Sequence, residues 1–153
     1  LIKEAGEGHF VNTSSSEGLQ ASAGTGAYNV TKFGIVALTE TLSNELKSFV
    51  DINASVLCPG PVQSRIIESE RNRPESLWNG GIPAAGLVDN EQSSDLLAGA
   101  MDPDLVADMV LDGIMNNQFW IITHDETKDA VRNRAEALLK DGSLSASVYD
   151  FTE

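Results

Sequence analysis

The stretch INASVLCPG, residues Ile52–Gly60, decides the fold. Its first seven residues place apolar side chains at alternate positions, which is typical of a β-strand, and its closing Pro-Gly ends the strand abruptly. Upstream, the run HFVNTSS at residues 9–15 is rich in strand-forming residues and precedes a polar stretch over 16–25, so it predicts a strand and then a loop. Residues 27–49 repeat apolar side chains at steps of three and four, which predicts a helix between the two strands.

The helix over 27–49 is expected to have two apolar faces. One face is a stripe that should be buried against the sheet, and its members are Ile35, Leu38, Leu42 and Leu46. The other face carries Phe33, Val36 and Phe49. A second apolar face indicates burial against something beyond the sheet.

The second half of the chain continues the alternation of strands and helices. Residues 61–101 are long and irregular, and a segment of this length inside a compact domain is usually functional. The triplet DPD at 102–104 is a helix start signal, and QFWIIT at 118–123 suits a strand covered on both faces. Asp125 is expected to cap a last helix that runs to about Lys140. This order implies parallel strands joined by right-handed crossovers, with helices on both faces of the sheet.

Length, charge and cysteine content restrict the class of protein. A chain of 153 residues with 41% hydrophobic residues fits one globular domain. The net charge of -13 argues against nucleic acids and anionic membranes as partners, because both attract basic patches. The single cysteine excludes an intramolecular disulfide, and no apolar run is long enough to span a bilayer. We therefore expect a cytoplasmic protein.

Polar residues that could carry chemistry gather at the carboxyl ends of the first two predicted strands. Ligands bind at that edge of an open parallel sheet, and residues 14–16 and 59–64 both leave strands there. Tyr28 and Lys32 are four residues apart, so their side chains share one face of the helix that starts from this edge. A nearby ammonium and a helix N-terminus both favour the phenolate form of a tyrosine. The pair is therefore suited to proton transfer near neutral pH.

Three segments, taken in order, resemble a known family. GHFVNTSSSEG at 8–18, YNVTK at 28–32 and PGPVQS at 59–64 look like the second half of a classical short-chain dehydrogenase/reductase, and the match covers nearly the whole chain. The family's serine lies thirteen residues before its tyrosine, which selects Ser15. The resemblance implies that residues 1–153 are the C-terminal portion of one Rossmann-like, doubly wound α/β domain, with three parallel strands and flanking helices.

The resemblance also implies a hydride-transfer site for NAD or NADP and an alcohol or ketone. Tyr28 would be the general acid/base, Ser15 would hydrogen-bond the substrate oxygen, and Lys32 would hold the nicotinamide ribose and lower the pKa of Tyr28. Further cofactor contacts are implied for Tyr28 itself and for Pro59, Gly60, Val62 and Ser64. The segment 61–101 would be the substrate lid, and the helix over 27–49 would form a subunit interface of a homodimer or homotetramer.

Two departures from the family pattern qualify what the resemblance implies. Ser64 stands where the family usually has threonine, and either hydroxyl can bond the cofactor. The chain lacks the Gly-rich phosphate loop, the residue that selects NAD or NADP, and the Asn of the catalytic set, so we expect an excerpt of an enzyme. Two alternatives stay open: an epimerase or dehydratase of the extended subfamily, which shares YxxxK, and a truncated, non-catalytic binding or oligomerisation module.

The remaining reactive side chains are given ordinary roles. His9 and His124 flank strands without a pattern of cysteines or carboxylates around them, so no metal site is expected. Cys58 ends an apolar strand and is expected to be a small buried hydrophobe rather than a nucleophile. Ser14 and Ser16 are interpreted as bystanders of Ser15.

Overall fold

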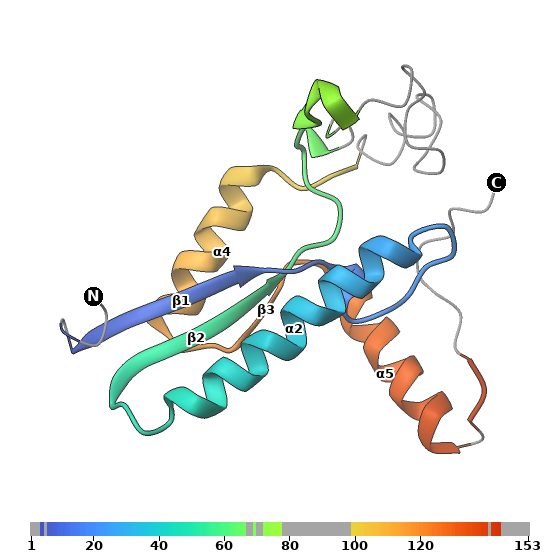
Figure 1. Ribbon diagram of the computed structural model, residues 1–153. Coiled ribbons are helices and arrows are strands. Elements are labelled where there is room, and N and C mark those ends of the chain that lie inside the picture. The colour runs from blue at the N-terminus through green and yellow to red at the C-terminus, as the bar shows by residue number, and fades with distance from the viewer. Residues whose placement is uncertain are drawn as a thin grey trace.

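A parallel three-stranded sheet forms the centre of the molecule (Figure 1). The computed structural model describes residues 4, 6–66, 69, 72–77, 99–140 and 142–144. The strands lie side by side in chain order and are β1 Glu7–Thr13, β2 Asp51–Cys58 and β3 Trp120–Ile122. β1 pairs with β2 along its whole length, and β3 pairs with the last three residues of β2. The predicted α/β fold with parallel strands is confirmed.

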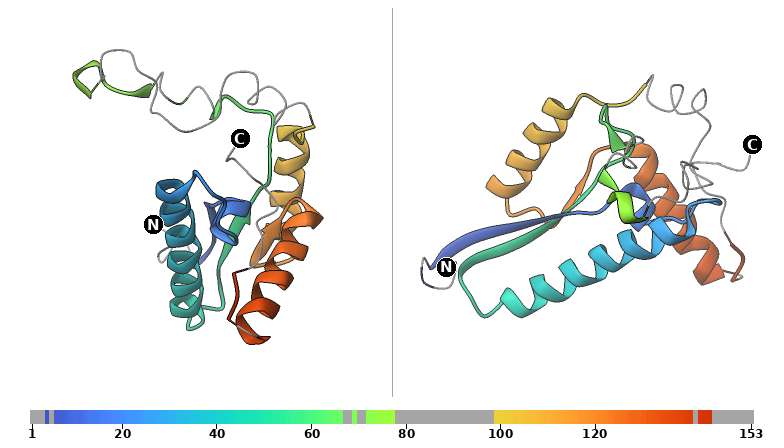
Figure 2. Two further views of the ribbon diagram at one scale, coloured as in Figure 1. Left: turned by 90° about the vertical axis from the view of Figure 1, so that its right-hand side faces the viewer. Right: turned by 45° about the horizontal axis from the view of Figure 1, so that its top comes forward.

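Helices cover both faces of this sheet (Figure 2). The helices are α2 Gly26–Leu46, α4 Pro103–Met115 and α5 Asp125–Lys140, and two short 3-10 helices are η1 Ser16–Gly18 and η3 Glu75–Leu77. α2 packs on one face and α4 on the other. α5 starts just beyond β3 and reaches α2, where the guanidinium of Arg134 lies 5.3 Å from the ring centroid of Phe33.

The apolar core is divided between the two faces of β2, because successive side chains of a strand point to opposite sides. On the α2 face, Val56 and Cys58 pack with Val36, and four partly buried side chains surround them: Leu19, Phe119, Trp120 and Ile122. On the α4 face, Leu57 packs with Val106 and Ile121. The alternation predicted for residues 52–58 therefore supplies both halves of the core.

The predicted core stripe of α2 is wrong at one position and misses the residues that are most buried. Leu38 has 63% of its surface exposed, whereas Val36 is 7% exposed and Thr39 is fully buried. Thr39 can be buried because its hydroxyl accepts a hydrogen bond from the Asn12 side chain (3.0 Å) and donates to the carbonyl oxygen of Ile35 (2.6 Å). The face of α2 that contains Val36 thus faces the sheet.

Helix α4 begins and ends as its sequence predicts. The carboxylate of Asp102 accepts a hydrogen bond from the backbone N–H of Asp104 (2.8 Å), and Pro103 opens the helix. Asn116 follows the last helical residue and Asn117 adopts a positive φ of 49°. α5 also ends at Lys140 as expected, but Asp125 is its first residue and pairs with Lys128 one turn on.

The segment predicted as a lid begins and ends at one place in the fold. Val62 forms an isolated parallel bridge with Met101, and backbone hydrogen bonds of 3.0 Å join Met101 N–H to the Pro61 carbonyl and Gln63 N–H to the Met101 carbonyl. Most of the residues between these two ends lie outside the described residues. None of the helices in the described part of the chain is both long and apolar enough to cross a membrane.

Candidate active site

The carboxyl ends of β1 and β2 are joined by backbone hydrogen bonds that continue past the strands. Ser14 N–H donates to the carbonyl of Leu57 (2.7 Å), and Ser16 N–H donates to the carbonyl of Pro59 (2.8 Å). The two predicted segments, 14–16 and 59–64, therefore meet where Ser16 bonds to Pro59. Their meeting point lies at the edge of the sheet where open parallel sheets bind ligands.

Ser15 is held in a defined orientation at this edge. Its backbone is extended, with φ -170° and ψ 165°, and it caps η1 by accepting the Glu17 N–H with its hydroxyl oxygen (3.1 Å). A hydroxyl that accepts this hydrogen bond still has its own hydrogen to donate. With 8% of its surface exposed, Ser15 can present that hydrogen to one small acceptor.

Tyr28 and Lys32 lie one turn apart at the start of α2, as their spacing predicts. The Lys32 Nζ is 5.4 Å from the centroid of the Tyr28 ring, within the range of a cation–π contact. It also donates to the carbonyl oxygen of Thr13 at the end of β1 (3.3 Å). Burial lowers the pKa of Lys32, and the charge interaction with Cys58 works in the opposite direction.

Ser14 joins the end of β1 to the same helix and so has a structural role that was not predicted. Its hydroxyl donates to the backbone carbonyl of Lys32 (2.8 Å), and only 2% of its surface is exposed. Gly18 crosses this contact so closely that a Cβ there would lie 2.2 Å from the Ser14 Oγ and 2.8 Å from the Lys32 carbonyl oxygen. This contact was not predicted, although the glycine at position 18 was a signal that two segments of backbone pass close together there.

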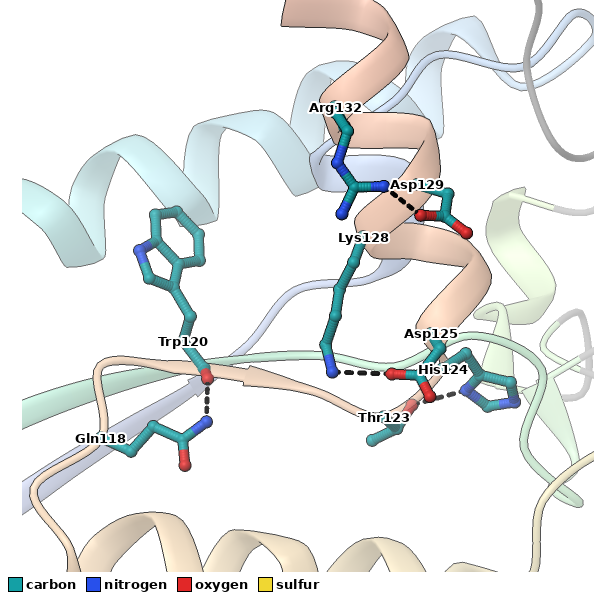
Figure 3. Close-up of polar contacts among 8 residues, drawn as sticks. All are labelled: Gln118, Trp120, Thr123, His124, Asp125, Lys128, Asp129 and Arg132. Carbon is teal, nitrogen blue, oxygen red and sulfur yellow. Dashed lines mark hydrogen bonds and ion pairs between the residues drawn. The ribbon is translucent and has the colours of Figure 1, made fainter.

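The Pro59-Gly60 turn packs against the end of β3. Gly60 N–H points to the Thr123 Oγ1 (3.2 Å) and the His124 Nδ1 (3.3 Å), and these two side-chain atoms are 2.6 Å apart (Figure 3). A Cβ on Gly60 would lie 2.8 Å from the His124 ring, so only glycine lets the turn pass. The contact with His124 was not predicted either.

The other two residues implied in cofactor binding have different surroundings. Val62 is half-buried and packs against the apolar cluster on the α4 face, and Ser64 is exposed. Val62 and Ser64 lie at the start of the segment 61–101, and Pro59 and Gly60 directly precede it. The structure thus puts all four implied residues on one continuous stretch of backbone that leaves β2.

Cys58 lies beneath this site as an unreactive thiol. It is fully buried, and burial raises its pKa to about 11, against smaller opposing effects that include a hydrogen bond with Ser14. A thiol with this pKa is almost entirely protonated at neutral pH and is a poor nucleophile. The predicted role of Cys58 as a small buried side chain is confirmed.

Two features lie apart from the residues described so far. A groove of about 530 Å³ runs along the second half of α2, where its lining includes Glu40, Asn44 and the aromatic pair Phe119 and Trp120. It starts more than two turns beyond Tyr28 and belongs to another part of the surface. Across the described ranges, no group of three or more His, Cys, Asp or Glu side chains is placed to hold a metal ion.

Known proteins share both the sequence pattern and the fold. Residues 1–75 match the family model described as short chain dehydrogenase. Similar proteins include the CLA biosynthesis dehydrogenase/reductase of Lactiplantibacillus plantarum, with 26% identity over 98% of this chain and 54% of that protein. The C alpha-dehydrogenase of a Sphingobium species is 27% identical over 91% of this chain and 45% of that protein. The chain therefore spans about half the length of these relatives.

A solved structure gives the same result. The short chain dehydrogenase/reductase from Burkholderia phymatum, in complex with NAD, has a TM-score of 0.85 and 30% sequence identity to this chain. The match covers 97% of this chain and 54% of that one. The family model, the similar proteins and the solved structure all agree with the family resemblance predicted from the sequence. The chain belongs to the short-chain dehydrogenase/reductase family.

Proposed function

We propose that residues 1–153 are the C-terminal half of a Rossmann-fold domain in an NAD(P)-dependent oxidoreductase that interconverts an alcohol and a ketone. One observation supports this function best. The ammonium of Lys32 lies 5.4 Å from the Tyr28 ring centroid at the start of α2, beside the strand end that carries Ser15. A phenol, an ammonium and a hydroxyl near one strand end are the groups that proton transfer to a carbonyl oxygen requires.

The residues at the strand ends fit a nicotinamide cofactor. An ammonium has three hydrogens to donate, and among the described residues Lys32 uses one of them on the Thr13 carbonyl oxygen. Two hydrogens therefore remain for the hydroxyls of a ribose. Pro59, Gly60, Val62 and Ser64 would line the nicotinamide side of the site. When bound, the nicotinamide supplies the hydride or accepts it.

Tyr28 and Ser15 would handle the proton and the oxygen. In the direction of reduction, the carbonyl carbon accepts a hydride and the electron pair of the C=O bond moves to oxygen. The Tyr28 hydroxyl gives its proton to that oxygen, while Ser15 donates a hydrogen bond to it. The phenolate that remains on Tyr28 is stabilised by the nearby Lys32 ammonium. Oxidation of an alcohol follows the same steps in reverse.

The test is turnover by the full-length protein with Tyr28→Phe. Loss of the phenolic proton should lower kcat by roughly 10²- to 10⁴-fold or more, because a positioned acid/base contributes about that much. Cofactor affinity and melting temperature should stay at wild-type values, since the ring and its packing are kept. Ser15→Ala should also lose turnover, and Ser16→Ala serves as its matched control. Undiminished kcat in Tyr28→Phe would refute the assignment.

We also propose that the outward face of α2 joins two copies of the full-length protein. Val30 and Leu38, eight residues apart on the same side of the helix, are 75% and 63% exposed. Exposed apolar side chains that line up on one helix face are typical of an interface. The double variant Val30→Gln/Leu38→Gln should lower the molar mass measured by light scattering to that of one chain. An unchanged mass would exclude this face as the contact.

A further inference from the structure

Glu17 is a buried acidic residue for which the reaction above has no use. Its exposed fraction is 5%, and within the described part of the chain no lysine or arginine pairs with its carboxylate. Charged side chains are almost never this buried unless they are paired or fully hydrogen-bonded, because desolvation of a charge is costly. The surroundings of Glu17 must therefore stabilise the carboxylate by other means.

The carboxylate is surrounded by neutral donors from the loop that leads into α2. Its Oε1 accepts from the Ser22 hydroxyl (2.7 Å) and, over a longer distance, from the Gln20 amide (3.5 Å). Its Oε2 accepts from the Ser22 backbone N–H (3.0 Å) and lies 3.3 Å from the Thr25 hydroxyl. All these donors belong to residues 20–25, so the carboxylate fixes the shape of this loop.

The same residue is bonded to Ser15 through its backbone. The Glu17 N–H donates to the Ser15 Oγ at 3.1 Å, which turns the Ser15 hydroxyl hydrogen toward other acceptors. A shift of the backbone at Glu17 would therefore change where the Ser15 hydroxyl points. Glu17 connects Ser15 on one side with the loop 20–25 on the other.

Hydrogen bonds link the loop over residues 20–25 to the first turn of α2. Thr25 precedes the helix, and its hydroxyl makes no capping bond to the helix but lies 3.0 Å from the Asn29 Oδ1 and 2.9 Å from the Ser22 carbonyl oxygen. The Asn29 amide donates to the same Ser22 carbonyl (3.2 Å). Asn29 is buried and directly follows Tyr28. The start of α2 is thus held by side chains that the Glu17 carboxylate organises.

Charge adds to this arrangement. The first turn of α2 contains no acidic residue, although a negative charge there interacts favourably with the helix N-terminus. The Glu17 carboxylate, in contact with Thr25 immediately before the helix, is placed to supply that charge.

We propose that Glu17 is a positioning residue that sets Tyr28 relative to Ser15 by tying the Ser15 turn to the first turn of α2. The proposal rests on the proposed function, because it concerns the geometry of the same two groups. Glu17 itself touches neither substrate nor cofactor. Its effect is on kcat, since small displacements of reacting groups lower the rate without removing a binding contact.

The experiment compares Glu17→Ala with Glu17→Gln in the full-length protein. The alanine variant removes the acceptors that Ser22 and Thr25 now use, and kcat should fall roughly 10- to 100-fold, as displacements near 1 Å do. KM for the cofactor should stay within about two-fold, because no cofactor contact is lost. Glutamine has the same shape: its oxygen can accept the Ser22 N–H and its amide can donate to the Ser22 hydroxyl, so this variant should recover most of kcat. Glu45→Ala, an exposed glutamate of α2, is the matched control and should behave as wild type.

Each outcome has a defined meaning. A folded Glu17→Ala variant with wild-type kcat, or a Glu17→Gln variant as impaired as Glu17→Ala, overturns the proposal. If Glu17→Ala does not fold, Thr25→Val decides, since it keeps the Glu17 carboxylate and removes the hydroxyl that lies between Glu17, Ser22 and Asn29; a fall in kcat at constant cofactor KM supports the proposal and an unchanged kcat overturns it. Full activity of Tyr28→Phe would refute the proposed function itself, whereas an active wild type with an active Glu17→Ala refutes only the role of Glu17.

Discussion

The helices α2 and α4 flank the same sheet but are built by different rules. α4 starts with a carboxylate cap at Asp102 and a proline at its first position, and its buried residues are Val106 and Gly113. α2 starts without a side-chain cap bond, and two of its three buried residues, Asn29 and Thr39, are polar. α4 begins and ends with local signals, whereas the start of α2 is held by hydrogen bonds to residues earlier in the chain. Conflicts between local preference and structure tend to mark functional sites, and here they mark the helix that carries Tyr28 and Lys32.

The polar contacts of α2 explain why a helix can begin with such unfavourable residues. Gly26, Tyr28, Asn29 and two β-branched residues in its first two turns all have modest helix propensity. The loss of helix stability is small for each of these residues and can be offset by tertiary contacts. In α2 these contacts come from the loop around Glu17 and from Ser14, which donates to the Lys32 carbonyl. The position of this helix is therefore determined by the segment that also carries Ser15.

The largest expected effect is a loss of turnover, without a loss of stability, when Lys32 on α2 is replaced. Lys32→Met in the full-length protein should lower kcat by at least about 100-fold, because the phenolate of Tyr28 loses its stabilising charge. The melting temperature should not fall, since burial disfavours the ammonium and the methionine stem keeps the packing. Activity assays and thermal unfolding of the same preparation test both parts. A variant that loses stability and activity together would assign Lys32 to the fold alone.

The lowered pKa of Lys32 adds a pH dependence to this prediction. Below the folded-state pKa the ammonium is charged in both states, so the native state carries the full cost of burying it. As pH rises from the folded-state pKa toward 10.5, the ordinary pKa of a lysine, the unfolded state binds more protons than the native state, and the free energy of unfolding increases. The wild type should therefore gain stability relative to Lys32→Met on going from pH 8 to pH 10.5. The opposite trend would contradict the buried position of the ammonium.

The next effect compares one buried valine on each helix. Val36→Ala on α2 and Val106→Ala on α4 each remove two methyl groups from sites that are 7% and 9% exposed, and each should lower the free energy of unfolding by about 2 kcal/mol. Denaturant titration measures both. Only Val36→Ala should also lower kcat, because Val36 lies one turn beyond Lys32. Equal losses of kcat in the two variants would remove the functional difference between the helices.

A smaller effect concerns the helix cap that distinguishes α4. Asp102→Ala should destabilise the protein by about 1 kcal/mol, since the N–H of Asp104 loses its acceptor. Asp102→Asn keeps a capping oxygen and should destabilise the protein by only a few tenths of a kcal/mol. kcat should be unchanged in both variants. If alanine were harmless at this position, the capping explanation for the start of α4 would be incorrect.

The smallest effect is expected for exposed apolar residues. Leu111 on α4 and Leu38 on α2 are 59% and 63% exposed, so Leu111→Gln and Leu38→Gln should each change the free energy of unfolding by less than about 0.5 kcal/mol when measured on separated chains. The two variants should differ in assembly only, with Leu38→Gln weakening association. A large destabilisation by Leu38→Gln in the separated chain would indicate that Leu38 is buried, as the predicted apolar stripe required.

The elements with regular local signals could be predicted from the sequence. β2 was expected over 52–58 and spans 51–58, because alternation followed by Pro-Gly is a local pattern. α4 was located by its cap and proline. β1 was expected over 9–15 and covers Glu7–Thr13, and β3 is shorter than expected. Strand ends depend on pairing with a neighbour, which a single sequence does not show.

The orientation of α2 and the contacts of the site could not be predicted in full. Apolar side chains on α2 form two stripes, and choosing between them required knowing that Thr39 is buried through its bond to Asn12. The spacing of YNVTK predicted that Tyr28 and Lys32 share one face of α2, as they do, and counting back from the tyrosine selected Ser15 as the candidate serine. The contacts of Glu17 and Ser14 are with partners that are near in space, so these contacts appeared only with the structure.

The bridge between Val62 and Met101 bears on how such a domain can diversify. The two ends of the segment 62–101 are joined by backbone hydrogen bonds, which form whatever the side chains are. Since the entropic cost of a longer closed loop rises only slowly with its length, insertions and exchanges there leave the strands and helices in register. Under the proposed function, exchanging this segment between relatives would change which molecule is accepted while Ser15, Tyr28 and Lys32 keep their positions.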